Sequence, residues 1–544
     1  MTLIGKTPSA YDYPLLIKNL FLAPVVDNPQ QEIVYRGETR MTYQDFRSRV
    51  HRLAGALAGL GVKPGDTVAV MDWDSHRYLE CYFAVPMLGA VLHTVNIRLS
   101  PEQILYTIDH AEDDVLLVNA EFLPIVEQIR GRIDTVKKYV LLCDEEQRPS
   151  TTLPLAGEYE ELLAAAAPSF PFADFDENTR ATTFYTTGTT GMPKGVYFSH
   201  RQLVLHTLGT LTALGTTASQ GRLHQGDVYM PITPMFHVHA WGFPYIATSL
   251  GVKQVYPGRY LPNTLLQLIA REGVTFSHCV PTILHMLMAS PEYAATDLSR
   301  WKVVIGGAAL PKKMCRAGLD KGIDIFSGYG MSETCPVLTL AHVDRPGLSR
   351  DEEVEIRCKT GRPLPLVQLR VVDENMNEVP RDGETVGELV GRAPWLTQGY
   401  WKDGRNSENL WREGYLHTGD VARIEESGYI TITDRIKDVI KVGGEWLSSL
   451  ELEDILNLHA AVSEVAVIGM ADDKWGEKPL ALIKLREGQE EPTQKDMINH
   501  VKAFIDKGLM SKLALLLQVR YVSAIAKTSV GKIDKKVLRG QQPG

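Results

Sequence analysis

The sequence predicts an α/β protein, with a large N-terminal domain of mixed, largely parallel sheets flanked by helices and a small α+β domain at the C-terminal end. Two observations predict this class. Apolar strand-like segments alternate with helical segments over the first two-thirds of the chain, and shorter strand-like pieces with turn residues between them follow after about residue 362. A chain of 544 residues is several times longer than one ordinary domain, so more than one folding unit is expected.

The large domain is expected over residues 1–434. Its first clear helix is TYQDFRSRVHRLAGALAGLG, where apolar residues recur at helical spacing, Thr42 and Asp45 mark the start and Gly61 marks the stop. The strand TVAVMDW follows directly. The same alternation continues through the strand-like segments DVLLVN, KYVLLCD, GVTFSHCVP and KVVIGGAAL, which indicates a substantial parallel sheet.

The pattern changes twice in the C-terminal third. Residues 362–434 are expected to form a β-rich subdomain, from pieces such as VQLRVVDEN and GYITITD. Residues 435–544 are expected to form the small α+β domain, with helices in SSLELEDILNLH and QKDMINHVKAFIDKG and strands in EVAVIGM and PLALIKL. The apolar run LALLL near the end is interpreted as a buried helix or strand, with a partner or lipid surface as the alternative.

Composition and charge exclude several classes of protein. The net charge of -9 is spread along the chain without a dense Lys/Arg stripe, which argues against a nucleic-acid partner. Six scattered cysteines without a CxxC pair argue against a disulfide framework and a zinc cluster, and favour a reducing cytoplasm. No run of eighteen apolar residues occurs, so a transmembrane helix is not expected, while peripheral membrane contact stays open. The early run PLLIKNLFLAPVV is interpreted as mature structure.

A loop rich in glycine and threonine carries the first chemical signal. In FYTTGTTGMPKGVYFSH, glycines allow backbone N–H groups to close around phosphate oxygens, hydroxyls add donors and a lysine adds positive charge. The pattern is not a Walker loop, and a polar surface turn without a ligand is the alternative. The residues expected to bind phosphate are Thr186, Thr187, Gly188, Thr189, Thr190, Gly191 and Lys194.

Four further segments follow this loop in the order FSGYGMSET, GYLHTGD, DRIKDVIKVGGEW and KTSVGKIDKKVLR. Together, the five segments resemble the motifs of the adenylate-forming superfamily, which contains acyl-CoA ligases, adenylation domains and luciferases. The resemblance spans the chain. It implies an enzyme that uses ATP, Mg²⁺ and coenzyme A, a small domain that is mobile between two reaction poses and, by analogy with the family, a homodimer.

The resemblance also assigns the nucleotide site. Tyr329 is expected to stack on adenine, although a core aromatic is the alternative, and Glu333 with Thr187 is the implied magnesium site. Asp420 and Arg435 correspond to the residues that bind the ribose hydroxyls, although either could be a plain charge at a loop end. The remaining residues expected around ATP or AMP are Gly307, Ala308, Ala309, Ser327, Gly328, Gly330, Ser332, Lys437 and Trp446.

Two half-reactions are implied for the C-terminal residues. Lys532 matches the catalytic lysine that bridges the attacking carboxylate and the α-phosphate, although a solvated lysine in a charged tail is the usual alternative. Lys437 matches the hinge. In the second pose Lys441 would face the active site, while Gly443 and Gly444 would leave a narrow path for the thiol of coenzyme A.

The segment ITPMFHVHAWGFPY resembles the start of the family's acyl pocket. His237 occupies the place where relatives that activate amino acids carry an aspartate, which disfavours an α-amino acid. Trp241, Phe243 and Tyr245 are expected to form an apolar wall, with ordinary core residues as the alternative, and Gly306 is expected to line the same pocket.

The chain most resembles medium- and long-chain fatty acyl-CoA ligases, which implies a hydrophobic acid converted to acyl-AMP and then to acyl-CoA. The alternatives are loading of a separate carrier protein, a short-chain or aryl acid, luciferase-like oxidation of the adenylate, and a catalytically silent nucleotide-binding protein. One departure from the family lies near the end, where Ala526 stands in place of the proline that commonly precedes the lysine motif.

Overall fold

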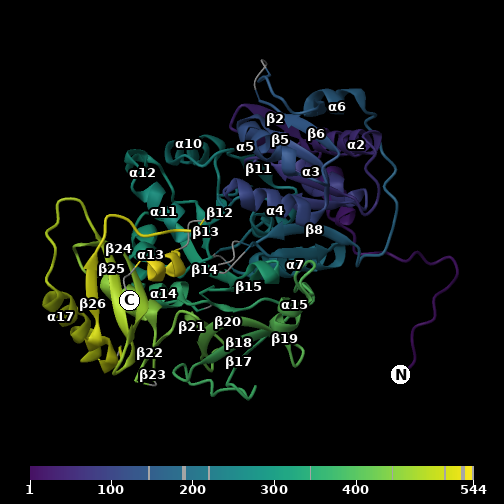
Figure 1. The fold of residues 1–544 in the computed structure, drawn as a ribbon. Helices are drawn as coiled ribbons and strands as arrows, with labels where there is room; N and C mark the ends of the chain where they lie inside the picture. Colours follow the sequence, from purple (N-terminus) through teal and green to yellow (C-terminus); the bar gives the residue numbers. More distant parts are fainter. Residues whose placement is uncertain are drawn as a thin grey trace.

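The fold is described from a computed structural model, which covers residues 1–144, 148–186, 192–218, 221–343, 345–443, 445–507, 510–528 and 533–541. Figure 1 shows two α/β layers in the N-terminal part, a β-rich sheet beside them and a C-terminal α+β unit. The predicted fold class is confirmed.

The first α/β layer is a seven-stranded sheet in the order β7-β6-β5-β3-β4-β8-β9. All neighbours pair in parallel except β8 and β9, which form an antiparallel hairpin. Strands β3 and β4 are buried along their whole length, as expected for parallel strands covered on both faces. The strands are β3 (Thr67–Met71), β4 (Val91–Thr94), β5 (Asp113–Asn119), β6 (Lys138–Leu142), β7 (Leu155–Glu158), β8 (Arg180–Tyr185) and β9 (Gly195–Ser199).

Helices connect these strands, and their ends follow local sequence signals. In α2 (Tyr43–Gly59) the Thr42 and Asp45 side chains form a reciprocal capping box, so the predicted helix start is confirmed. The other helical segments of this part are η1 (Ile17–Phe21), α1 (Leu22–Asp27), α3 (His76–Met87), α4 (Pro101–Ala111), η2 (Ala120–Phe122), α5 (Leu123–Ile129), η3 (Arg130–Arg132), α6 (Tyr159–Ala165) and α7 (His200–Thr216).

The second layer is a nine-stranded sheet in the order β16-β15-β14-β13-β12-β10-β11-β1-β2. Its middle strands are parallel, and antiparallel strands close both edges. The strands are β1 (Glu32–Tyr35), β2 (Thr39–Thr42), β10 (Val228–Tyr229), β11 (Lys253–Tyr256), β12 (Phe276–Cys279), β13 (Lys302–Ile305), β14 (Asp324–Gly330), β15 (Val337–Leu340) and β16 (Arg362–Pro363).

The helical segments of this layer include α13 and α14, which pack against each other beside β14. They are α8 (Val238–Trp241), α9 (Phe243–Leu250), α10 (Pro262–Glu272), α11 (Pro281–Met288), α12 (Pro291–Ala295), α13 (Lys312–Asp320), η4 (Ser332–Thr334) and α14 (Arg350–Cys358).

The β-rich segment forms a five-stranded sheet with only antiparallel pairs. The sheet ends at Arg435, so the expected boundary after residue 434 falls at the last residue of its final strand. The elements are β17 (Gln368–Val372), β18 (Gly387–Arg392), α15 (Gly404–Leu410), β19 (Trp411–Arg412), β20 (Tyr415–Ile424) and β21 (Ile430–Arg435).

The C-terminal unit has its own hydrophobic core and a five-stranded sheet built around the hairpin of β24 and β25. The LALLL run forms a short 3-10 helix, η5, in which Ala514 is buried and Leu515 is 40% exposed, so the expected burial holds for part of the run. The elements are β22 (Ile440–Val442), β23 (Glu445–Leu447), α16 (Ser449–Asn457), β24 (Val462–Asp472), β25 (Gly476–Leu485), α17 (Gln494–Ile505), η5 (Lys512–Leu516), β26 (Gln518–Tyr521) and α18 (Lys535–Gly540).

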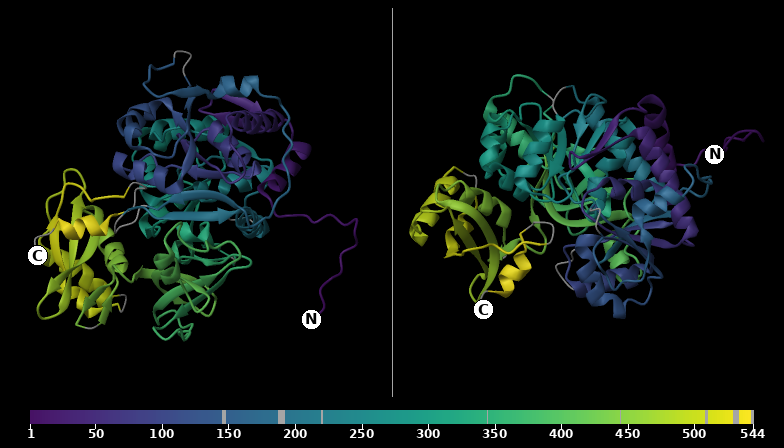
Figure 2. Two further views of the ribbon diagram at one scale, coloured as in Figure 1. Left: turned by 45° about the vertical axis from the view of Figure 1, so that its right-hand side comes forward. Right: turned by 90° about the horizontal axis from the view of Figure 1, so that it is seen from above.

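Figure 2 shows the C-terminal unit beside the rest of the chain, and two polar contacts join it to the β-rich sheet. The backbone N–H of Ser449, in the first turn of α16, donates to the Asp434 carboxylate over 2.6 Å, and Arg423 pairs with Glu451 over 3.1 Å. No helix within the described ranges is long and apolar enough to cross a membrane. All six cysteines are described, and each is a free thiol.

Candidate active site

The phosphate-binding segment lies at the end of the β8–β9 hairpin. Tyr185 pairs with Gly195 across the hairpin, and the Thr186 N–H donates to the Lys194 carbonyl over 3.0 Å. Thr186 and Lys194 therefore form the base of the loop. Its tip, comprising Thr187, Gly188, Thr189, Thr190 and Gly191, lies outside the described residues.

Lys194 and Glu333 meet at a tyrosine that the sequence analysis did not single out. The Lys194 ammonium lies 4.6 Å from the centre of the Tyr400 ring, and the Tyr400 hydroxyl donates to Oε1 of Glu333 over 2.6 Å. Glu333 lies in η4 and is only 8% exposed. No spacing in TQGYWK marks Tyr400, because its partners are distant in sequence.

The residues expected at the nucleoside are brought together by the end of β14, the middle of β20 and the end of β21. The Tyr329 hydroxyl donates to Oδ2 of Asp420 over 2.6 Å, and Arg435 Nε lies 3.2 Å from Oδ1 of the same carboxylate. Burial and the neighbouring Asp420 raise the pKa of Tyr329, and Asp420 also raises the pKa of Arg435. Asp420 is 4% exposed, so this corner is a charge-assisted cluster in a low-dielectric setting.

Small residues at the carboxyl ends of β13 and β14 allow neighbouring segments of the backbone to approach each other closely. A Cβ on Gly330 would lie 1.8 Å from the Pro336 carbonyl oxygen, so no larger residue fits there. Gly307 has a φ of +76°, and the adjoining Ala308 and Ala309 are exposed. Ser327 is buried and its hydroxyl has no partner among the described residues, while Ser332 is half-buried and begins η4.

Gly306 joins the nucleotide end of β13 to the expected acyl wall. A Cβ at Gly306 would lie 2.9 Å from both the Gly328 carbonyl oxygen and the Trp241 indole. The acyl segment and the glycines of the nucleotide site are therefore in contact. In parallel α/β sheets this carboxyl edge is where ligands bind.

The acyl segment has an unusual backbone. Val238, His239, Ala240 and Trp241 all have φ between 47° and 58°, a left-handed turn of four consecutive non-glycine residues. Each such residue costs about 1–2 kcal/mol relative to the right-handed form. Backbone strain of this kind concentrates at binding sites, where the surrounding packing holds it.

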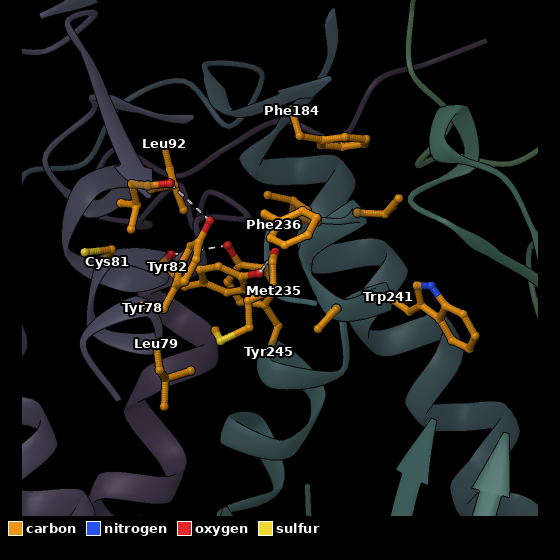
Figure 3. Close-up of a cluster of buried hydrophobic side chains, with 14 of the residues drawn as sticks. Tyr78, Leu79, Cys81, Tyr82, Leu92, Phe184, Met235, Phe236, Trp241 and Tyr245 are labelled. Atoms are coloured by element: carbon orange, nitrogen blue, oxygen red, sulfur yellow. Dashed lines mark hydrogen bonds between the residues drawn. The ribbon is translucent and has the colours of Figure 1, made fainter. Parts of the chain in front are cut away.

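The side chains around this turn form a buried aromatic cluster (Figure 3). The Tyr245 hydroxyl donates to the Tyr82 carbonyl over 3.2 Å, and the Tyr82 hydroxyl donates to the Met235 carbonyl over 2.5 Å. Phe243 stacks on His278 with ring centres 4.6 Å apart, and Trp241 lies 5.1 Å from the same imidazole. His237 lies half-buried before the turn.

Sequence patterns did not assign two buried histidines of this cluster to the site. Burial lowers the pKa of His239 and of His278 to about 3, so both imidazoles are neutral and contribute to the aromatic wall. Neither ring nitrogen of His239 has a hydrogen-bond partner within the described structure. The second histidine of HVHAWG was the available signal for His239, whereas His278 lies on β12, outside every motif.

The residues expected to serve the second half-reaction lie apart from this cluster. The Lys441 N–H donates to Glu477 over 2.8 Å, and the Gly443 N–H donates to the Trp475 carbonyl over 2.7 Å, so both are held by the C-terminal sheet. Trp446 pairs with Lys441 in the β22–β23 hairpin. Burial and the charge of Arg435 lower the pKa of Lys437. Gly444 and Lys532 fall outside the described residues.

The described part of the expected magnesium site fits a cation that takes few protein ligands. Glu333 offers a buried carboxylate, while its expected companion Thr187 is not among the described residues. Within the described ranges, no group of three or more His, Cys, Asp or Glu residues could hold a metal ion. Mg²⁺ bound to a nucleotide needs only one or two carboxylate or hydroxyl oxygens beside the phosphates, which agrees with this sparse donor set.

Comparisons with known proteins give the family. The family model described as AMP-binding enzyme matches residues 23–401, and the model of the AMP-binding enzyme C-terminal domain matches residues 451–532. A long-chain-fatty-acid–CoA ligase of Thermus thermophilus is 41% identical over 524 residues, which cover 94% of this chain and 93% of the relative. A 3-methylmercaptopropionyl-CoA ligase of Ruegeria lacuscaerulensis is 38% identical over 539 residues, 97% of each chain.

Solved structures agree with this assignment. The crystal structure of an anthranilate CoA ligase in complex with anthranoyl-AMP superposes with a TM-score of 0.83 at 25% identity, over 97% of this chain and 98% of that chain. The chain therefore belongs to the AMP-binding enzyme family of the adenylate-forming superfamily, and the resemblance inferred from the five motifs is confirmed. Within that family it is an AMP-forming acid–thiol ligase.

Proposed function

We propose that this enzyme activates a medium- or long-chain fatty acid with ATP, releasing pyrophosphate and forming an acyl-adenylate, and then transfers the acyl group to coenzyme A. One observation carries this proposal. At Gly306, the buried aromatic segment of Trp241 contacts the glycine-lined end of β13 and β14, where the nucleotide residues gather. A hydrophobic acid bound against the aromatic segment would therefore lie next to an adenylate bound at these glycines.

The first half-reaction joins the acid to the nucleotide. A carboxylate oxygen of the acid attacks the α-phosphorus of ATP, the bond to the β-phosphate oxygen breaks, and pyrophosphate leaves. In our proposal Thr186, Lys194 and the loop between them bind the phosphates, Asp420 and Arg435 bind the ribose, and Tyr329 flanks the adenine. Bound Mg²⁺, held by Glu333 and Thr187, would supply positive charge to the phosphates.

The proposed role of Lys532 belongs to the same half-reaction. Its ammonium bridges the carboxylate and the α-phosphate while negative charge builds at phosphorus. Lys527, five residues before it, pairs with Glu464 of β24 over 2.6 Å, so the chain that leads to Lys532 leaves from the C-terminal sheet.

The second half-reaction requires a different face of the C-terminal unit. The sulfur of coenzyme A attacks the acyl carbonyl carbon, the bond to the AMP oxygen breaks, and the thiol proton is lost. We assign the approach of the thiol to Gly443 and Gly444, with Lys441 and Trp446 beside them. Because Lys441 and Gly443 are held by the C-terminal sheet, this role requires the C-terminal unit to rotate about Lys437.

The identity of the acid has one specific alternative. The Thermus thermophilus relative is named for long-chain fatty acids, whereas the Ruegeria lacuscaerulensis relative is named for a small thioether acid and is nearly as similar. Both acids lack an α-ammonium group, which agrees with a histidine at position 237. The extent of the aromatic wall favours the longer hydrophobic acid.

A panel of acids distinguishes these substrates. AMP and pyrophosphate release would be measured with butyrate, octanoate, palmitate, 3-methylmercaptopropionate and anthranilate, each with and without coenzyme A. We expect the highest kcat/KM with octanoate or palmitate, and CoA-dependent release of AMP. A preference for 3-methylmercaptopropionate would replace the fatty acid by the small thioether acid, and AMP formation with none of the acids would contradict the proposed function.

A further inference from the structure

We infer that Tyr400 is a positioning residue for the first half-reaction, which orients the magnesium-binding carboxylate of Glu333 and the phosphate-binding ammonium of Lys194 from one side chain. This inference rests on the proposed function, because the roles of Glu333 and Lys194 are part of it. Its structural basis is separate, since no sequence motif used above includes Tyr400.

The backbone around Tyr400 spans the two halves of the nucleotide site. Trp401 N–H donates to the Gly195 carbonyl over 2.8 Å, directly after the phosphate loop, and Tyr400 forms a β-bridge with Val196. On the other side, Thr397 N–H donates to the Glu333 carbonyl over 2.9 Å. Residues 397–401 therefore connect the root of β9 to η4.

The start of α15 fixes this connection. The Tyr400 N–H donates to Ser407 Oγ over 2.8 Å, and that hydroxyl donates in turn to the Asp403 carbonyl over 2.7 Å. A Cβ on Gly399 would lie 2.6 Å from the same Ser407 oxygen, so the preceding residue must be glycine. The Tyr400 backbone is consequently held from both directions, independently of its own side chain.

The side chain then contacts both charged groups. Its hydroxyl donates to one oxygen of Glu333, Oε1, while no described residue donates to the second oxygen, Oε2. Its ring lies 4.6 Å from the Lys194 ammonium, a cation–π distance. Among the described residues no ion pair joins Lys194 to Glu333. Tyr400 therefore contacts an ammonium and a carboxylate that do not pair with each other.

This arrangement suits a carboxylate that has to bind a metal beside a phosphate. A hydrogen bond to one oxygen selects the orientation of a ligating carboxylate and leaves the other oxygen for the cation. Loss of such a partner typically costs about 10–100-fold in metal affinity. Tyr400 therefore acts through Glu333 on the cation and through Lys194 on the phosphates.

The test is the Tyr400→Phe variant, which removes the hydroxyl and keeps the ring. Binding of a non-hydrolysable ATP analogue would be measured calorimetrically at graded Mg²⁺ concentrations and in EDTA, next to pyrophosphate release and CoA-dependent turnover of pre-made acyl-AMP. We expect the Mg²⁺ concentration for half-maximal binding to rise about 10–100-fold. Binding in EDTA should stay within about threefold, because the ring beneath Lys194 remains. Turnover of acyl-AMP should not change.

Tyr197→Phe is the matched control, because Tyr197 lies on β9 and its hydroxyl has no hydrogen bond with a described residue. A variant that combines Tyr400→Phe with Glu333→Gln provides a second test. If Tyr400 acts through Glu333, adding Tyr400→Phe to a Glu333→Gln background should produce no further loss of Mg²⁺ dependence. Glu333→Gln alone tests the carboxylate end of the contact, because a neutral amide should weaken Mg²⁺ binding while leaving binding in EDTA intact.

The outcomes separate the inference from the proposed function. Wild-type protein that forms no AMP with any acid contradicts the proposed function itself. Wild-type protein that does form AMP, with a Tyr400→Phe variant whose Mg²⁺ dependence stays within about twofold of wild type, overturns only the role of Tyr400. Equal losses in EDTA binding, pyrophosphate release and acyl-AMP turnover would also overturn it, since they would show a general structural role.

Discussion

At the scale of single residues, Asp420 shows how one carboxylate organises the nucleoside corner. It accepts from the Tyr329 hydroxyl on β14 and faces Arg435 across the β20–β21 ladder, so three distant parts of the chain meet at two oxygens. Because Asp420 is nearly inaccessible to water, its bond from Tyr329 is shielded from solvent, whereas the Arg435 side chain is 47% exposed and its pairing is partly screened. The same oxygens are the acceptors that we propose for the ribose hydroxyls.

Replacement of Asp420 by asparagine should therefore weaken ATP binding selectively. Hydrogen bonds to a charged group contribute about 1.5–3 kcal/mol, so we expect the KM for ATP to rise about 10–100-fold in Asp420→Asn. Initial rates of pyrophosphate release at graded ATP concentrations measure this. Asp373→Asn makes the same chemical change in an exposed turn and should leave the KM unchanged. An unaltered KM in Asp420→Asn would remove Asp420 from the nucleotide site.

At the scale of elements, the contact between β14 and β15 depends on the absence of a side chain. Gly330→Ala would place a methyl group against the Pro336 carbonyl oxygen, an atom of the backbone that has little freedom to move. We expect a cost of about 1–3 kcal/mol or more, measured as a lower thermal unfolding midpoint, together with loss of pyrophosphate release. Gly404→Ala is the control, since nothing lies within 4 Å of its added methyl group. Equal midpoints for the two variants would contradict this packing.

The end of β3 carries two buried acids, and one of them supports the acyl segment. Asp74 accepts from the Met235 N–H over 2.9 Å and from the Tyr260 hydroxyl, and burial raises its pKa to about 7. The folded carboxyl binds its proton more tightly than the unfolded one. The folded state therefore holds more protons between about pH 4 and pH 7, and stability falls as pH rises through that window.

Asp74→Asn removes this titration and keeps an oxygen that can accept from Met235. We expect the unfolding midpoint of the variant, relative to wild type, to increase from pH 5 to pH 8, while Asp72, with a pKa of about 6, titrates in both proteins. Asp382→Asn is the control and should show no such change between pH 5 and pH 8, because hydrogen bonds from Thr385 lower the pKa of Asp382 to about 2 and its carboxyl is ionised throughout that range. A difference between Asp74→Asn and wild type that does not vary with pH would show that Asp74 keeps an ordinary pKa.

Sequence patterns predicted the elements whose determinants are local. The capping box at Thr42 and Asp45, the buried strand at residues 67–71 and the α+β order of the C-terminal unit all depend on neighbouring residues. The left-handed turn at Val238–Trp241 could not be predicted, because no glycine signals it and tertiary packing imposes it. Tyr400 was missed for a related reason, since Glu333 lies 67 residues away.

At the scale of the whole molecule, polar contacts join the C-terminal unit to the β-rich sheet. Asp434 accepts from the Ser449 N–H at the start of α16, and Arg423 pairs with Glu451 over 3.1 Å. Polar contacts of this kind can exchange for others at little net cost. In our proposal, the C-terminal unit presents different faces to one nucleotide site in the two half-reactions.

Substitutions of two lysines in the C-terminal unit should each impair a different half-reaction. Lys532→Ala should suppress pyrophosphate release far more than CoA-dependent turnover of pre-made acyl-AMP, and Lys441→Ala should do the reverse. Each half-reaction would be followed separately by single-turnover kinetics. Equal losses in both half-reactions for either variant would contradict a pose-specific role for that lysine.

In the proposed reaction, the acid becomes covalently joined to AMP before it reaches the thiol. In the most direct measurement, the preferred acid carries ¹⁸O at both carboxyl oxygens, and the products are analysed by mass spectrometry. Attack of the carboxylate on the α-phosphorus, followed by cleavage of the acyl C–O bond, predicts one ¹⁸O atom in AMP and none in pyrophosphate. AMP without the label, or labelled phosphate or pyrophosphate, would show that no acyl-adenylate is formed.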